Sequence, residues 1–308
     1  MDGVLVIDKP QGLTSHDVVA AARRLLGEGR IGHTGTLDPL ATGVLPLAIG
    51  RATRLVRFLA ASDKEYAATI RFGLTTDSYD VTGAETGRTG AAPSRDAVLG
   101  ALGRLTGEYL QTPPSYSAKK VEGRRAYALA RGAQTVVLAP APVRVARVEL
   151  VAFDGERARV TLTCSAGFYV RSFAHALGEL AGTGACLEAL RRIRAGEFTI
   201  EAAVQLEELS DAARVASRLV PLHALLGGLP AVTLTDRGRE RVAHGQELEP
   251  EDYTPAGPQE PPHLMAGDRR PGPVDPAWVR LIDARGALVA LATPGARAGS
   301  LHPSVVLI

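Results

Sequence analysis

A chain of 308 residues, 45% of them hydrophobic, can bury a substantial core, which excludes wholesale disorder. The two cysteines, Cys164 and Cys186, lack the spacing of a metal site; this argues against a disulfide framework or a cysteine zinc site and favours a reducing cytoplasm. Prolines and glycines interrupt the longest uncharged run, residues 219–235, and Asp2 and Asp8 flank the first apolar run, so we expect neither a membrane span nor a secretory signal.

The net charge of +2 is unevenly distributed along the chain. Residues 246–276 contain seven acids and two arginines, a net charge of −5, which leaves +7 for the rest of the chain. A basic body with an acidic appendage suits an RNA partner. Because many metabolic enzymes are equally basic, charge alone does not decide the function.

The first predicted elements are a strand over residues 3–7 and a helix that begins at Thr14 or Ser15 and ends at Gly27. Lys9 follows the strand. It is either a solvated lysine at a strand end or a lysine that faces RNA, and the residues leave both interpretations open.

The stretch from Gly32 to Pro46 has too many glycines, prolines and threonines for a helix and too little alternation for a regular strand. It is nevertheless apolar enough to be mostly buried. Asp38 is its one acid, and burying a carboxylate without donors or a cationic partner is costly. Asp38 is therefore either an acid that caps a turn or an active-site acid.

The middle of the chain alternates between helical and strand patterns. Tyr66 lies in the first of these strands and has the position of a half-buried strand aromatic. The predicted elements are a helix after residues 50–54, a strand at 64–72, a polar loop at 75–80, a flexible loop at 82–94, a helix at 95–105 and a strand at 107–111.

Residues 117–131 carry five basic residues and one acid, with tyrosines on both sides, and include Lys120. Basic groups beside aromatic rings suit RNA, through phosphate attraction and base stacking. The alternative is a charged amphipathic helix.

The next elements are a strand pair, 143–153 and 157–164, across an Asp-Gly turn, and a helix through Leu180. Residues 182–185 are predicted to open another helix that ends at 190–192. Arg171 lies among apolar residues and would be an expensive buried charge without an acid, so we expect it to pair with Asp38.

After Leu229 the pattern predicts strands at 232–235 and 244–248 and a hairpin over 278–292, which together suit a small β-barrel. We therefore expect a large domain over residues 1–228 and a small domain over 229–308. The acidic, Pro-rich residues 249–276 are expected to form an inserted flexible loop in the second domain.

Residues 32–46, with the sequence GHTGTLDPLATGVLP, resemble the catalytic motif of the bacterial tRNA pseudouridine-55 synthases, the stand-alone enzymes that act on the T-arm uridine of tRNA. Further motifs of that family follow in the same order: D-K-P-x-G at 8–12, S-D-K-x-Y at 62–66, T-D-x-x-D at 76–80, P-P-x-Y-S-A-x-K at 113–120 and G-x-Y-[IV]-R at 167–171. The resemblance implies that Asp38 is the catalytic residue. It also implies a substrate-binding role for His33, Tyr66, Tyr169, Arg171, Leu190, Lys9, Asp80 and Lys120.

The resemblance further implies an α+β fold, with a mixed, largely antiparallel sheet flanked by helices and a PUA-like C-terminal β-barrel that binds RNA. The reaction breaks the glycosidic bond of a flipped-out uridine and rejoins the base through carbon, so no cofactor and no metal are expected. The expected partner is the tRNA T-arm, and the expected state is a cytoplasmic monomer.

Two alternatives stay open, of which the first belongs to another class of protein. The first is a non-catalytic RNA-binding or tRNA-folding protein that uses the same basic surface. A carboxylate that faces RNA contributes nothing to binding, so Asp38 argues against a protein that only binds RNA. The second is the related synthase subunit of a guide-RNA ribonucleoprotein, although the form of the motif at 32–46 is closer to that of the stand-alone enzymes.

Overall fold

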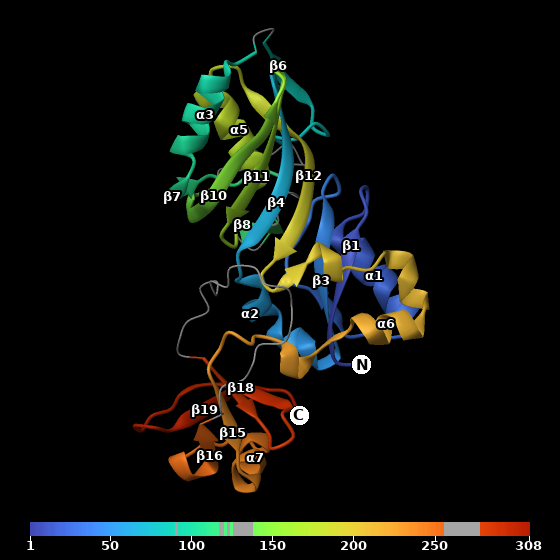
Figure 1. The fold of residues 1–308 in the computed structure, drawn as a ribbon, viewed down its shortest axis with the longest axis vertical. Coiled ribbons are helices and arrows are strands. Elements are labelled where there is room, and N and C mark those ends of the chain that lie inside the picture. Colours follow the sequence, from blue (N-terminus) through green and yellow to red (C-terminus); the bar gives the residue numbers. More distant parts are fainter. Residues whose placement is uncertain (90–91, 117–119, 122–123, 126–137, 256–277) are drawn as a thin grey trace. The chain divides into compact units, whose positions relative to one another are not determined.

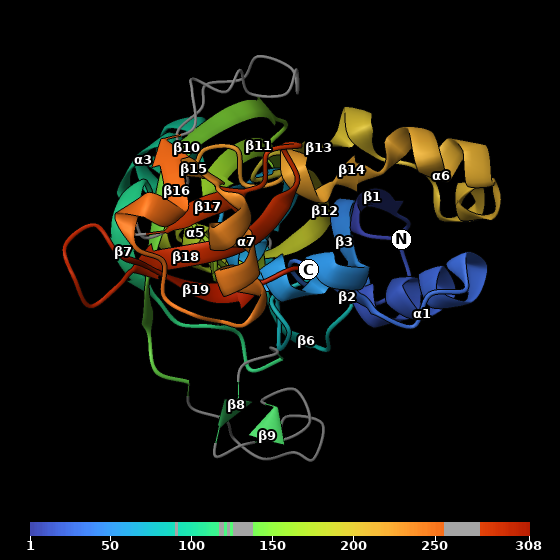
Figure 2. The same cartoon turned by 90° about the horizontal axis from the view of Figure 1, so that it is seen from below.

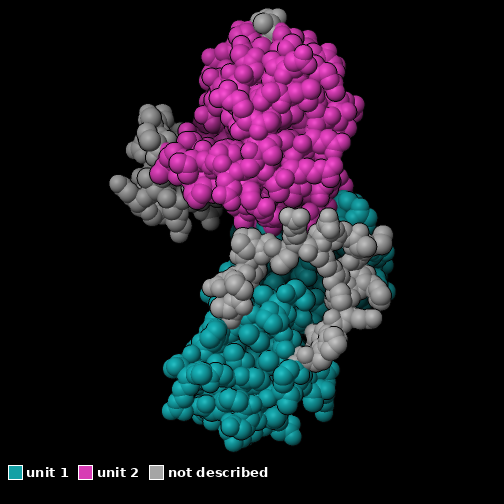
Figure 3. All heavy atoms as spheres, turned by 60° about the vertical axis from the view of Figure 1, so that its left-hand side comes forward, with its two compact units in different colours: residues 1–38, 44–62, 195–308 teal, residues 39–43, 63–194 magenta. Residues whose placement is uncertain are grey.

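The computed structural model describes residues 1–89, 92–116, 120–121, 124–125, 138–255 and 278–308 (Figure 1). Most of the predicted basic segment 117–131 and most of the predicted loop 249–276 lie outside these residues. The chain divides into two compact units (Figure 3): unit 1 consists of residues 1–38, 44–62 and 195–308, and unit 2 of residues 39–43 and 63–194. The predicted domain boundary at 228/229 stays a prediction.

Unit 1 begins with the predicted strand and helix. Strand β1 (Gly3–Lys9) lies between β3 (Thr42–Ile49) and β14 (Val220–Pro221), and β2 (Ile31–His33) pairs antiparallel with β3. Helix α1 (Ser15–Leu26) starts with a capping box between Thr14 and Asp17 and ends at Gly27, whose φ of 62° is left-handed. The predicted helix limits are confirmed.

The prediction that residues 32–46 contain no regular strand is wrong at both ends of that range, since Gly32 and His33 belong to β2. Thr42–Pro46 belong to β3, where Pro46 occupies a strand position. Pairing partners explain this, because Ile31 and His33 pair with Ile49 and Leu47 at the far end of the strand. A strand with buried neighbours on both sides needs no polar alternation.

The rest of unit 1 before the C-terminal sheet consists of short elements: η1 (Gly50–Leu55), α2 (Val56–Ala60), β13 (Phe198–Thr199), η2 (Ile200–Ala202), η3 (Leu206–Ser210), α6 (Ala212–Arg218) and η4 (Leu222–Ala224). Helix α2 shares a hydrophobic core with the C-terminal sheet. There Phe58 meets Trp278 edge to face, with ring centroids 4.8 Å apart, and the guanidinium of Arg57 lies over both rings.

The C-terminal residues form a five-stranded sheet in the order β16-β15-β17-β18-β19 (Figure 2). Its strands are β15 (Ala231–Leu234), β16 (Tyr253–Pro255), β17 (Val279–Ile282), β18 (Leu288–Pro294) and β19 (Leu301–Val306). The predicted hairpin over 278–292 is confirmed as β17 and β18. The predicted strand over 244–248 is wrong, since only Leu248 makes a bridge, to Leu301, and the sequence missed the preceding helix α7 (Asp236–Ala243).

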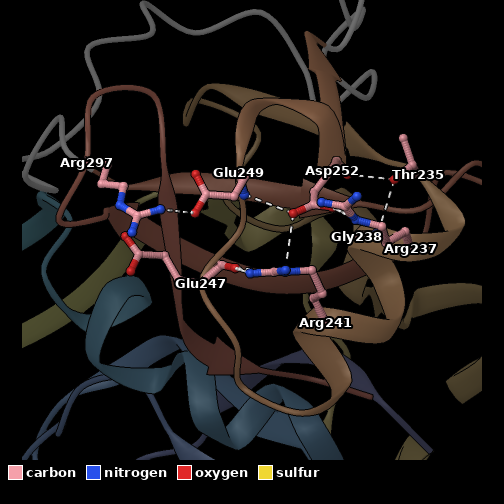
Figure 4. Close-up of polar contacts among 8 residues, drawn as sticks. All are labelled: Thr235, Arg237, Gly238, Arg241, Glu247, Glu249, Asp252 and Arg297. Atoms are coloured by element: carbon pink, nitrogen blue, oxygen red, sulfur yellow. Dashed lines mark hydrogen bonds and ion pairs between the residues drawn. The ribbon is translucent and has the colours of Figure 1, made fainter.

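A buried carboxylate ties α7 to the chain before β16 (Figure 4). Asp252, in η5 (Pro250–Asp252), is fully buried; its Oδ1 lies 2.7 Å from Nε of Arg237 and its Oδ2 3.3 Å from Nε of Arg241. The backbone N–H of Glu249 donates to the same carboxylate at 2.9 Å. Two cations and an N–H therefore compensate the cost of burying this charge.

Unit 2 contains a sheet in the order β12-β4-β11-β10-β7. Its strands are β12 (Ala185–Ala195), β4 (Lys64–Phe72), β11 (Arg157–Cys164), β10 (Ala141–Phe153) and β7 (Gly107–Gln111). Helices α3 (Arg95–Arg104) and α5 (Val170–Ala181) pack against each other beside this sheet (Figure 1). The predicted strands at 64–72, 107–111, 143–153 and 157–164 and the helix at 95–105 are confirmed, and the α+β class with them.

Two predictions in unit 2 are wrong. Residues 185–192, predicted as part of a helix, belong to the strand β12, which lies between neighbours in the sheet and has a largely buried sequence. Pairing on both sides outweighs the helical propensity of its alanines and leucines. In the predicted flexible loop 82–94, β6 (Glu85–Arg88) pairs with β5 (Leu74–Thr76).

Candidate active site

The loop that carries Asp38 is fixed at its base by two sets of hydrogen bonds within unit 1. The backbone N–H of Thr34 donates to the carbonyl of Pro46 at 3.1 Å. The N–H of Leu37 donates to Oγ of Ser15 at 2.8 Å. The Ser15 hydroxyl in turn donates to the carbonyl of Leu37 at 3.2 Å. The residue directly before the half-buried Asp38 is therefore held by the first turn of α1.

The sequence did not identify Ser15 as a site residue. Ser15 was a candidate only for the helix cap, but Thr14 has that role. The hydroxyl of Ser15 instead accepts a hydrogen bond from Leu37, 22 residues away in the loop. No local pattern indicates a contact of this separation. Only the packing of α1 against the loop brings the two together.

Ser15→Ala is expected to lower the free energy of unfolding by about 1–3 kcal/mol, because it leaves a buried N–H and carbonyl of Leu37 without their partner. A looser Asp38 should lower the turnover rate by about tenfold. Urea denaturation and single-turnover kinetics measure the two effects. Ser94→Ala, which removes the exposed cap of α3, is the matched control and should leave turnover unchanged; equal turnover in both variants would contradict the anchoring role.

In unit 2, Gly43 holds the chain where the loop enters β3. Thr42 and Gly43 pair in parallel with Arg191 and Arg192 of β12. Gly43 has a φ of 99°, and a Cβ there would lie 2.2 Å from the carbonyl oxygen of Arg192. A side chain is therefore excluded by both conformation and contact.

Strand β4 presents alternate side chains to the interior of unit 2, and Tyr66 is one of them, at 8% exposure. Leu190 of β12 is also buried, and its carbonyl lies 3.4 Å from the hydroxyl of Thr42. The sequence predicted the strand position of Tyr66, whereas Leu190 had been placed on a helix.

Lys64 lies on the same buried face of β4 as Tyr66. Burial lowers the pKa of its ammonium group from 10.5 to about 8, and the positive charge of Arg192 acts in the same direction. The folded chain thus releases this proton near pH 8, whereas the unfolded chain holds it until about pH 10.5. Between these values the unfolded state binds more protons, so this group makes the free energy of unfolding rise with pH.

Lys64→Met is expected to lack this rise, which amounts to about 3 kcal/mol between pH 8 and 10.5. The measurement is urea denaturation of both proteins across that range. Burial raises the pKa of the Cys164 thiol to about 12 and raises the pKa of the Tyr109 hydroxyl above its ordinary value. Both groups oppose the rise of the free energy of unfolding with pH, and they do so in both proteins. Only the difference between the two curves is therefore diagnostic. Parallel curves would show that Lys64 does not titrate in this range.

Arg171 is a buried cation of unit 2, at 6% exposure. Its Nη1 donates to the carbonyl of Ser78 at 3.0 Å and its Nη2 to the carbonyl of Tyr116 at 2.8 Å, while Nε lies 3.7 Å from Oδ2 of Asp80. The sequence expected an acid partner for Arg171, and the structure shows Asp80 in that position. The predicted pair with Asp38, which belongs to unit 1, stays a prediction.

Asp80 is itself buried and held by several donors. Its Oδ1 accepts from the backbone N–H of Thr82 at 2.9 Å and from the hydroxyl of Ser78 at 3.0 Å, and the Thr82 hydroxyl donates to it as well. Its backbone forms a bridge with Leu187. The carboxylate is therefore rigid enough to orient Arg171.

Tyr169 precedes α5 and is half-buried. The side chain of Gln111 holds its backbone: the Tyr169 N–H donates to Oε1 at 2.8 Å, and Nε2 donates to the Tyr169 carbonyl at 3.1 Å. This paired amide contact fixes the start of the helix that carries Arg171. The sequence did not single out Gln111, which it read only as the end of a strand.

The other predicted site residues have different surroundings. Lys9 is fully buried, and its ammonium donates to the carbonyls of Pro10 at 2.8 Å and Leu13 at 2.6 Å, so it holds the turn before α1. His33 ends β2 and is half-buried. The backbone of Lys120 lies in β8 (Lys120–Val121), which pairs with β9 (Arg124–Arg125), and its side chain lies outside the described part. Contacts of these residues with RNA stay predictions.

The sequence matches two family models in succession. Residues 23–170 match the TruB family pseudouridylate synthase N-terminal domain, and residues 171–226 match the tRNA pseudouridylate synthase B C-terminal domain. A curated relative from Solibacter usitatus, tRNA pseudouridine synthase B, is 45% identical over 252 residues, which cover 80% of this chain and 86% of the relative. The chain belongs to the TruB family of pseudouridylate synthases.

Other TruB relatives extend the match. A tRNA pseudouridine synthase B from Syntrophus aciditrophicus is 39% identical over 297 residues, which cover 95% of this chain and 91% of the relative. Among solved structures, an H/ACA RNP bound to a substrate RNA containing 2′-deoxyuridine includes a chain with a TM-score of 0.71 and 25% identity, covering 99% of this TruB chain and 85% of the other. The fold is the pseudouridine synthase fold, and the predictions of the family and of an isomerase are confirmed.

No helix in the described ranges has both the length and the apolar character needed to cross a membrane.

Proposed function

We propose that this TruB synthase converts the T-arm uridine of tRNA, position 55, to pseudouridine, with Asp38 as the catalytic carboxylate. The observation that carries the proposal is the anchoring of Leu37 by Ser15, which gives the half-buried Asp38 a defined position. The curated relatives from Solibacter usitatus and Syntrophus aciditrophicus are both called tRNA pseudouridine synthase B, which supports tRNA as the substrate.

The reaction breaks the C1′–N1 bond of uridine, rotates the uracil and joins C1′ to C5; C5 releases its proton and N1 takes one up. It involves no net oxidation or hydrolysis, so the side chains of the chain suffice. A carboxylate can attack the nucleotide covalently or accept a proton from C2′. Both routes place Asp38 at the reacting sugar and base.

A uridine within a folded RNA must leave its stack to reach such a group. Tyr66, Tyr169 and Leu190 are proposed to form the walls of the pocket for the flipped base, with Arg171 paired with Asp38. The further proposed substrate-binding residues are His33, Lys9, Asp80 and Lys120.

Residues 229–308 are proposed to form a PUA-like RNA-binding domain. The support is the compact five-stranded sheet with α7 packed on it. The proposed partner is the T-arm of tRNA, and the proposed state is a cytoplasmic monomer.

The test is release of tritium from a T-arm stem-loop that carries 5-tritiated uridine at the target position. We expect one tritium per RNA, because the new bond at C5 displaces the label. A second stem-loop has cytidine at the target and tritiated uridines elsewhere, and it should release none. Equal release from both RNAs would contradict selection of the T-arm uridine, and no release from either would contradict the proposed substrate.

A further inference from the structure

A tyrosine and a histidine outside the predicted site stack face to face in unit 2. The rings of Tyr79 and His175 have centroids 4.0 Å apart and planes only 7° apart. Tyr79 lies in the turn between Ser78 and Asp80, both of which contact Arg171. His175 is four residues after Arg171 on α5, so both side chains lie on one face of the helix.

The backbone of Tyr79 is held in an unfavourable conformation. Its φ is 63°, a left-handed value that only one other non-glycine residue, Leu226, has in the described part of the chain. A tyrosine adopts this region only when surrounding contacts compensate for it. Two hydrogen bonds and the ring stack provide these contacts. The N–H of Tyr79 donates to the carbonyl of Thr76, and the N–H of Leu187 donates to the carbonyl of Tyr79.

We propose that the Tyr79–His175 stack is a positioning contact that holds the 76–80 turn on α5, so that Ser78 and Asp80 keep the guanidinium of Arg171 in its orientation. Arg171 and His175, four residues apart on α5, then contact residues 76–80 at two points. Arg171 does so through polar contacts and His175 through its ring. The activity readout of this proposal rests on the proposed function.

The ring of His175, and not its charge, serves this role. Burial lowers the pKa of His175, so the imidazole is neutral at pH 7, against the opposing influence of Glu179 on the same helix. Its Nδ1 is buried without a hydrogen-bond partner among the described residues. A neutral ring used as a flat surface can be replaced by phenylalanine.

The experiment compares variants that keep the stack with variants that remove it. Tyr79→Phe and His175→Phe keep two stacked rings. His175→Ala removes one ring, and Tyr79→Gly removes the other while suiting the left-handed backbone. In the tritium-release assay we expect kcat to fall by about tenfold to hundredfold in the Gly and Ala variants, with KM nearly unchanged and kcat within about threefold of wild type in the Phe variants.

The double variant Tyr79→Gly/His175→Ala is expected to be no slower than the slower single variant, because both substitutions remove one interaction. Full activity of the Gly and Ala variants, or equal losses in the Phe variants, would overturn the proposal.

Amide hydrogen exchange gives a readout that does not depend on the substrate. Loss of the stack should speed exchange at the N–H of Thr82, which donates to Asp80, relative to the Phe variants. Unchanged exchange in the Gly and Ala variants overturns the positioning role. If the wild-type chain releases no tritium, the proposed function fails, and the exchange comparison still decides the role of the stack.

Discussion

Asp38→Asn is expected to lower turnover of a T-arm stem-loop by between about 10³-fold and 10⁶-fold, the range seen when a catalytic base or nucleophile is removed. Asparagine is nearly isosteric with aspartate, and the bonds that hold Leu37 come from Ser15, so the loop should keep its conformation. RNA binding and the free energy of unfolding should therefore change little. Tritium release, filter binding and urea denaturation measure these three quantities.

Two further variants sharpen this test. Asp38→Glu keeps the carboxylate but moves it by about the length of one carbon–carbon bond, and it should lose about 10²-fold in rate. Asp96→Asn changes an exposed acid in the first turn of α3 and should have wild-type activity. If Asp38→Asn kept more than a tenth of the wild-type rate, Asp38 would not be the catalytic carboxylate.

Arg171→Met is expected to lower the free energy of unfolding by about 3–5 kcal/mol, the cost of leaving a buried charge without its partner. The substitution strands the carboxylate of Asp80 and removes the donors to the carbonyls of Ser78 and Tyr116. Turnover at a temperature where the variant is folded should also fall, because the proposed site uses this guanidinium. Urea denaturation and tritium release measure the two effects.

The double variant Arg171→Met/Asp80→Asn separates the charge from the packing. Removing the stranded carboxylate should recover about 1–3 kcal/mol relative to the single variant, since the two residues are coupled. Arg144→Met is the matched control: Arg144 forms an ion pair of 2.8 Å with Asp63, but its side chain is 42% exposed, so the loss should stay below about 1 kcal/mol. Equal losses in Arg171→Met and Arg144→Met would show that burial of the first pair has no energetic consequence.

The pattern of side chains predicted the elements whose signals are local. Helix α1 has a capping box at one end and a left-handed glycine at the other, and both lie within a few residues of the helix. Strand β4 alternates strictly between buried and half-buried positions, so its period identified it. In such elements, local propensity and burial agree.

Predictions failed where neighbours in the fold opposed local propensity. The composition of β12 suits a helix, but the strand is paired on both sides within its sheet. The residues before His244 had no strong helical pattern, yet Thr235 caps α7 and Asp252 holds two of its arginines from another segment. A short helix stabilised mainly by tertiary contacts leaves little trace in its own sequence.

The sequence by itself determined the family, the α+β class and the candidate residues, because ordered motifs and local periodicity are properties of the chain alone. Only the tertiary structure decided which groups meet: Ser15 with Leu37, Gln111 with Tyr169, and Asp80 with Arg171. These pairs are 22, 58 and 91 residues apart. Contacts across such separations depend on how strands and helices pack together, and the free energy of that packing is not encoded in any single segment.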